Sequence, residues 1–125
     1  DVSDAARPAV VGEVAAAPEL AYVSQLALDA PSHLIIAASQ QGAAGAVVDV
    51  ADAANPKIMG SLTSDALDGA TGVAYDAARR LAYVASEFAG TLSVVNVTDR
   101  ATPVIVAGVC APCGNRPLSL GHAIE

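Results

Sequence analysis

A first set of residues that could do chemistry lies in a short sequence motif that occurs three times, which we call the phrase. It reads "DVADAANPKIMG" at residues 49–60, and near-copies are "DVSDAARPAVVG" from Asp1 and "NVTDRATPVIVA" from Asn96. Each copy places two side-chain oxygen donors three residues apart, as in Asp49 and Asp52. Oxygen donors of this type bind hard cations such as Ca²⁺. Asp49, Asp52 and Asp99 are therefore candidate metal ligands.

A second interpretation gives the same side chains a structural role. Asp and Asn commonly accept backbone N–H bonds two or three residues further along a turn. Two carboxylates make a poor calcium site, because that ion takes about six to eight oxygen ligands. Each copy of the phrase would also lie in a different part of the fold. We therefore favour the turn role and predict no resident metal or cofactor.

Cys110 and Cys113 in "VCAPCGNRP" form the other feature that could take part in chemistry. Their spacing fits a local disulfide, a redox pair or half of a zinc site. A redox pair of the thioredoxin type needs a βαβ setting, and His122 is the one further zinc ligand nearby. We expect a small loop disulfide or two reduced thiols.

Composition excludes several classes of function. The 125 residues are 54% apolar and 15% charged, which is enough apolar material to bury the core of one domain. A net charge of −7 with six Lys and Arg disfavours nucleic-acid binding. Polar residues, Pro or Gly interrupt every apolar run before it reaches the roughly 18 to 20 residues of a membrane span.

The similarity between copies extends beyond the phrase, at a spacing of 47 residues. Identical partners between residues 26–50 and the next copy are Ala27/Ala74, Asp29/Asp76, Ala30/Ala77, Leu34/Leu81, Ala38/Ala85, Ser39/Ser86, Val47/Val94, Val48/Val95 and Val50/Val97. Within each period, four β-type runs are separated by turn residues. In the later copy the runs are "VAYD", "LAYVAS", "TLSVVNV" and "PVIVAGV".

The turn chemistry supports a four-stranded antiparallel unit. Gly90 ends the hairpin connection "EFAG" and is suited to a positive φ. Pro103 opens the last run, a position where the missing backbone N–H group of proline costs the sheet no hydrogen bond. Alanine is abundant and favours helices, but paired β-branched residues and turn signals every 8 to 12 residues favour strands. Four strands repeated every 40 to 50 residues are typical of a β-propeller blade.

The combination of "LAYVAS" with "LSVVNVTDRATPVIVAGV" resembles the LVIVD-repeat propellers, which are related to the YVTN-like group. Blades of that family carry a Tyr-Val-Ala strand and an Asp-Val-Ser-Asp-Pro-like turn, although this chain has Ala in place of the usual Pro after the second Asp. The resemblance implies an all-β fold and a secreted or cell-surface location.

We expect a β-propeller fragment of about two and a half four-stranded antiparallel blades. Its expected parts are residues 1–14, the end of one blade; 20–62, a full blade; 70–109, a second full blade; and 118–125, the start of a further blade. Propellers close with about four to eight blades, so this length cannot close a ring. We expect the remaining blades or self-association to cover its apolar faces.

The sequence favours a non-enzymatic repeat segment that acts as a scaffold for a protein partner or a small ligand. The alternative is part of a propeller hydrolase or oxidoreductase whose catalytic residues lie outside this segment. A third class is a metal-stabilised adhesion module. The expected inner strands carry mainly Ala, Leu, Val and Gly, whereas an enzyme needs His, Glu or Asp there. This favours the scaffold.

Overall fold

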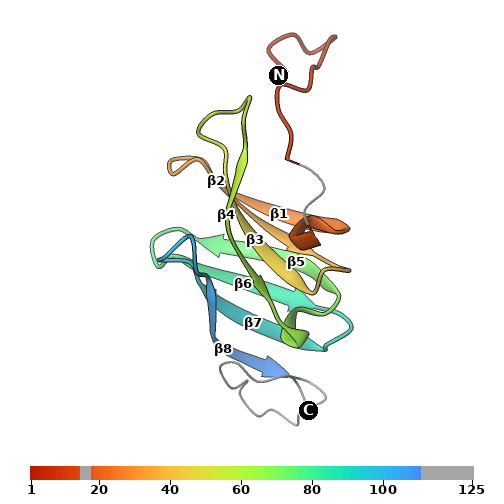
Figure 1. The fold of residues 1–125 in the computed structure, drawn as a ribbon, viewed down its shortest axis with the longest axis vertical. Helices are drawn as coiled ribbons and strands as arrows, with labels where there is room; N and C mark the ends of the chain where they lie inside the picture. Colours follow the sequence, from red (N-terminus) through yellow and green to blue (C-terminus); the bar gives the residue numbers. More distant parts are fainter. Residues whose placement is uncertain (15–17, 111–125) are drawn as a thin grey trace.

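The computed structural model describes residues 1–14 and 18–110. They form an all-β structure of two antiparallel four-stranded sheets (Figure 1). The first sheet contains β1 (Val23–Asp29), β2 (Leu34–Ser39), β3 (Ala44–Asp49) and β4 (Lys57–Thr63). The second contains β5 (Ala70–Asp76), β6 (Leu81–Ser86), β7 (Thr91–Asn96) and β8 (Val104–Cys110). In each sheet the strands pair in chain order, so both sheets are simple meanders.

The two sheets are built on the same 47-residue spacing. Every strand of the second sheet begins and ends 47 residues after its counterpart, and the single-turn 3₁₀ helices η1 (Pro18–Leu20) and η2 (Asp65–Leu67) keep this spacing. The register irregularity between Val47 and Val48 recurs between Val94 and Val95. The repeated residues therefore reproduce local geometry as well as strand positions.

Backbone conformation follows the same spacing. Residues with positive φ occur in counterpart pairs, namely Tyr22 and Gly69, His33 and Arg80, and Ala43 and Gly90. The expected left-handed conformation of Gly90 is confirmed, with φ 67°. Ala43 adopts φ 47° at the equivalent turn, although an L-residue pays a steric cost there. This hairpin therefore keeps the left-handed conformation even without glycine.

The hydrophobic core lies between the two sheets. Its buried members come from both sheets and from η2 and include Leu34, Ile36, Val47, Leu67 and Val84. The middle strands β2 and β3, whose sequence is apolar nearly throughout, are buried along nearly all their length. Their counterparts β6 and β7 alternate between buried and exposed residues. The middle strands are thus less covered in the second sheet than in the first.

The N-terminal part of the expected architecture differs from its middle. Residues 8–14 have the sequence of a fourth strand, but they belong to no strand. A fourth strand needs a third to pair with, and residues 1–7 form a turn and no strand. In Figure 1 they lie at the opposite end of the molecule from β8. Residues 118–125, expected to open a further blade, lie outside the described residues.

No α-helix occurs in residues 1–14 or 18–110, so the strand interpretation of the alanine-rich runs is correct there. The same residues contain no helix long and apolar enough to span a membrane.

Candidate functional site

The three copies of the phrase form three turns, which we call the acidic turns: residues 1–7, 49–55 and 96–102. In the second, Asp49 Oδ1 accepts a hydrogen bond from the Ala51 N–H at 2.8 Å, and Asp52 Oδ1 accepts from the Ala54 N–H at 3.1 Å. Asp52 Oδ2 also accepts from Asn55 Nδ2 at 2.9 Å. Both carboxylates thus hold the backbone of their own turn.

The other two acidic turns repeat these bonds. Asn96 Oδ1 accepts from the Thr98 N–H at 2.8 Å, while Asp99 accepts from the Ala101 N–H at 3.1 Å and from Thr102 Oγ1 at 2.7 Å. In the first turn Asp1 and Asp4 accept from backbone N–H groups two residues onward, at 2.8 and 3.0 Å. The expected turn role is therefore observed in all three copies.

The candidate metal ligands do not form one cluster. Asp49 and Asp52 share a turn, and Asp99 lies in the next turn. In residues 1–14 and 18–110 no group of three or more His, Cys, Asp or Glu side chains could hold a metal ion. Hydrogen-bond donors within the turns lower the pKa of both carboxyl groups. The largest effect on the pKa of Asp52 comes from the Asn55 side chain, and the largest effect on the pKa of Asp99 comes from the Thr102 side chain.

A glycine at the end of the phrase lies directly against the next acidic turn. A Cβ atom placed on Gly60 in β4 would be 2.3 Å from the Arg100 carbonyl oxygen and 2.6 Å from that of Ala101. One placed on Gly12 would be 2.1 Å from the Ala53 oxygen. Real Cβ atoms do not approach backbone oxygens this closely, so only glycine permits the contact. Each copy of the phrase thus provides both a turn and the surface that receives the following turn.

The first strands of the two sheets are joined by polar side chains. Ser24 Oγ in β1 donates to the Ala70 carbonyl oxygen at 2.6 Å, and Gln25 Oε1 accepts from the Val73 N–H at 2.6 Å. Both bonds join a side chain of β1 to the backbone of β5. The sheets are therefore held at two places, near their first strands and near their outer strands.

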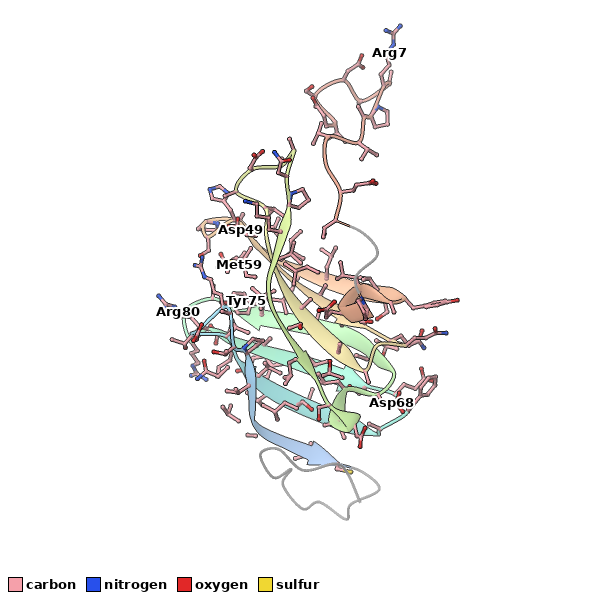
Figure 2. The ribbon with its side chains drawn as sticks, in the orientation of Figure 1. Arg7, Asp49, Met59, Asp68, Tyr75 and Arg80 are labelled. Atoms are coloured by element: carbon pink, nitrogen blue, oxygen red, sulfur yellow. The ribbon has the colours of Figure 1, made fainter. Side chains whose placement is uncertain are left out.

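The seam between the sheets also contains a titratable phenol. The pKa of Tyr75 is raised above 10.0, first by burial and then by the negative charge of Asp29. The positive charges of Arg100 and Arg80 oppose this shift only in part. Figure 2 shows Tyr75 and Arg80 on the same side of the molecule as Asp49. Tyr75 therefore stays a neutral phenol near pH 7 and is unsuited to act as a base.

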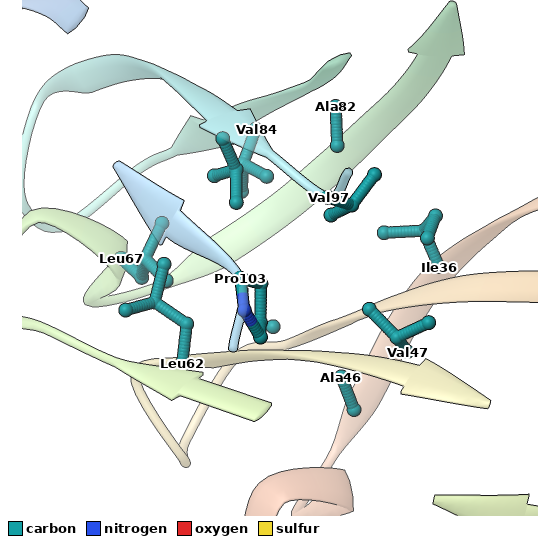
Figure 3. Close-up of a pocket in the computed structure, with 11 residues that line it drawn as sticks. Ile36, Ala46, Val47, Leu62, Leu67, Ala82, Val84, Val97 and Pro103 are labelled. Atoms are coloured by element: carbon teal, nitrogen blue, oxygen red, sulfur yellow. The ribbon is translucent and has the colours of Figure 1, made fainter. Parts of the chain in front are cut away.

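Between the sheets the packing is apolar and nearly complete. Figure 3 shows the small space that remains, of about 20 Å³. It is lined by Ile36, Gly45, Ala46, Val47 and Leu62 of the first sheet and by Leu67, Ala82, Val84, Val95, Val97 and Pro103. No ionisable side chain lines it, so this space serves packing rather than acid–base chemistry.

Cys110 ends β8 and is buried. No free cysteine occurs among the described residues. Cys113 lies outside them, so the pairing of Cys110 with Cys113 stays a prediction, and so does any zinc role of His122.

The sequence interpretation missed the residues that join the sheets. Gly12 and Gly60 stand at the end of the quoted phrase, and Ala107 replaces them in the third copy. That pattern is a signal for a close backbone contact, but it does not say which segment makes the contact. Ser24 and Gln25 carry no repeat signal, because their counterparts are Thr71 and Gly72.

Comparison with known proteins adds no family to these observations. No protein-family model matches the chain, and no curated protein matches it either.

We predict that Gly60→Ala destabilises the fold, because its methyl group would overlap the Arg100 carbonyl oxygen. The free energy of unfolding should fall by about 1–3 kcal/mol, as for other overpacked sites. Chemical denaturation followed by far-UV circular dichroism measures this change. Gly45→Ala is the matched control, since its Cβ would be 3.7 Å from the nearest atom. Equal stability of the two variants would contradict the contact.

The acidic turns also predict a pH dependence. Asp52 and Asp99 have a lower pKa in the folded chain than their ordinary value of 3.8, because the turn donors bind the ionised form better. Their contribution to stability is therefore complete above that value and is lost as the pH falls through the lower folded pKa. Carboxyl ¹³C NMR should give midpoints below 3.8 for both folded side chains. Midpoints at or above the urea-unfolded values would be inconsistent with these bonds.

Proposed function

We propose that the two sheets are adjacent blades of a β-propeller and that the propeller is a non-enzymatic scaffold for a protein partner. The observation that carries this proposal is the recurring contact between a glycine and the next acidic turn. Gly12 and Gly60 make the same contact 48 residues apart along the chain. A packing step that recurs from one sheet to the next is what generates a ring or a solenoid from successive sheets.

The seam supports a ring over a flat array of sheets. The first strands β1 and β5 pack against each other, and β1 bonds to β5 through Ser24 and Gln25. In a propeller the first strand of every blade faces the central axis, so such neighbours are expected there. The four-stranded meander of each sheet is the blade topology.

The scaffold role is supported by the carboxylates of the acidic turns, which already have a structural role. The carboxylates of the acidic turns hold backbone N–H groups. Exposed residues of the inner strand β1 include Val23, Leu26 and Leu28, at 44%, 54% and 60% exposure. These apolar side chains suit contact with another protein surface. The resemblance to LVIVD-repeat and YVTN-like propellers adds an extracellular or cell-surface location to the proposal.

The proposal is tested on the protein encoded by the complete open reading frame that contains this sequence. Cryo-electron microscopy should show a closed ring of about four to eight blades, with the two sheets as neighbours. Panels of hydrolase and oxidoreductase substrates should give no turnover above that of a heat-denatured sample. An open array of sheets would contradict the propeller, and turnover would contradict the scaffold.

A further inference from the structure

The first sheet has an open groove on the face that points away from the second sheet. The groove runs between residues 12–14 and the strands β1 to β3, and its volume is about 330 Å³. Leu26 is 54% exposed on its wall. We call it the first-sheet groove.

The first-sheet groove repeats, position by position, the apolar space between the two sheets that Figure 3 shows, which we call the covered interface. Six residues on the second-sheet side of that interface have counterparts 47 residues earlier, and all six counterparts line the groove: Leu20, Ile35, Ala37, Val48, Val50 and Pro56. Val14 lies there in the place of Leu62. The groove thus already contains the counterpart of one wall of the covered interface, and Val14 supplies the counterpart of the outer-strand residue Leu62 opposite that wall.

What is missing from the groove is equally specific. The covered interface is completed by Ile36, Gly45, Ala46 and Val47, all from the hairpin of β2 and β3. Nothing among the described residues takes their place in the groove. Ile36 and Val47 face each other across that hairpin, so the missing element presents two large β-branched side chains side by side.

Residues 8–14 provide a place where such a hairpin can pair. Gly12 already lies on the acidic turn 49–55 as Gly60 lies on the turn 96–102. However, residues 8–14 belong to no strand, so their backbone groups are in no β-ladder. In the first sheet the counterpart strand β4 pairs with β3. An added hairpin would restore this pairing by β-augmentation.

From these observations we propose that the first-sheet groove binds an antiparallel β-hairpin of the repeat's own kind, with Ile and Val at the positions of Ile36 and Val47. In the propeller proposed above this place is filled by the preceding blade, so the occupant is the β2–β3-type hairpin of that blade, and this inference rests on that function. The hairpin β6–β7 is a poorer match, because it has Leu92 and Ser93 where the first has Gly45 and Ala46. Burial of the larger side chain and of an unpaired hydroxyl disfavours it. The methyl group of Ala107 also disfavours a second copy of the chain that docks through β8.

The test adds a fluorescent peptide of residues 34–49, with a lysine at each end for solubility, to the chain of residues 1–125. Fluorescence anisotropy should show saturable binding at one peptide per chain, and NMR should shift the amides of residues 10–14, Leu26 and Val48. The peptide variant Ile36→Asp should bind at least about tenfold more weakly, because a negative charge would be placed against apolar side chains and near the carboxylate of Glu13. The peptide of residues 81–96 should also bind more weakly.

A matched pair of receptor variants locates the site. Leu26→Lys, on the groove wall, should weaken binding at least about tenfold. Val109→Lys should leave it unchanged, since Val109 is equally exposed, at 55%, but lies on the second sheet. Both substitutions are at exposed positions, and unchanged circular dichroism and melting temperature would confirm that they fold.

Absence of saturable binding, or equal binding by the Leu26→Lys variant, would overturn the proposal. So would oligomers of the chain that Leu26→Lys dissolves, because the groove would then receive a second copy. A closed ring for the complete protein together with no peptide binding would reject the groove and leave the scaffold in place. An open array would reject the scaffold.

Discussion

The packing of this protein depends on the close approach of a turn backbone to a glycine in the preceding outer strand. A side chain at Gly60 would occupy the position of the Arg100 carbonyl oxygen, so the sheets could not keep this separation. The apolar interior follows from that separation, because Val47, Leu67 and Val84 make contact across the seam only when the sheets are close. Packing at this distance also explains the many small residues in β2, β3 and β6.

The acidic turns take their meaning from the same contact. A turn that fits against a glycine must present its carbonyl groups at a fixed place, and Asp52 and Asp99 fix that place by closing the turn on itself. The carboxylates look like metal ligands in sequence because a cation and a backbone N–H group recruit the same oxygen donors. In this fold the N–H groups are nearer, and no assembly of separate chain segments is needed to supply them.

Much of the fold could be predicted from the sequence. The 47-residue spacing, the β-branched pairs and the turn at Gly90 locate strands β2, β3, β6 and β7 closely, because these signals are local. Two features could not be predicted. Residues 8–14 have fourth-strand sequence without a strand, because a strand depends on a neighbour rather than on its own residues. The roles of Gly12, Gly60, Ser24 and Gln25 depend on which segments meet across the seam, and a repeat pattern alone does not show this.

The central claim is tested most directly by nuclear Overhauser effects in solution. The account predicts cross-peaks from the Gly60 Hα protons to Arg100 and Ala101, and from the Gly12 Hα protons to Ala53 and Ala54. Both sets should be present in the same sample, because one packing step is used twice. Their absence in a folded chain, with the strand pairings of both sheets intact, would contradict the account.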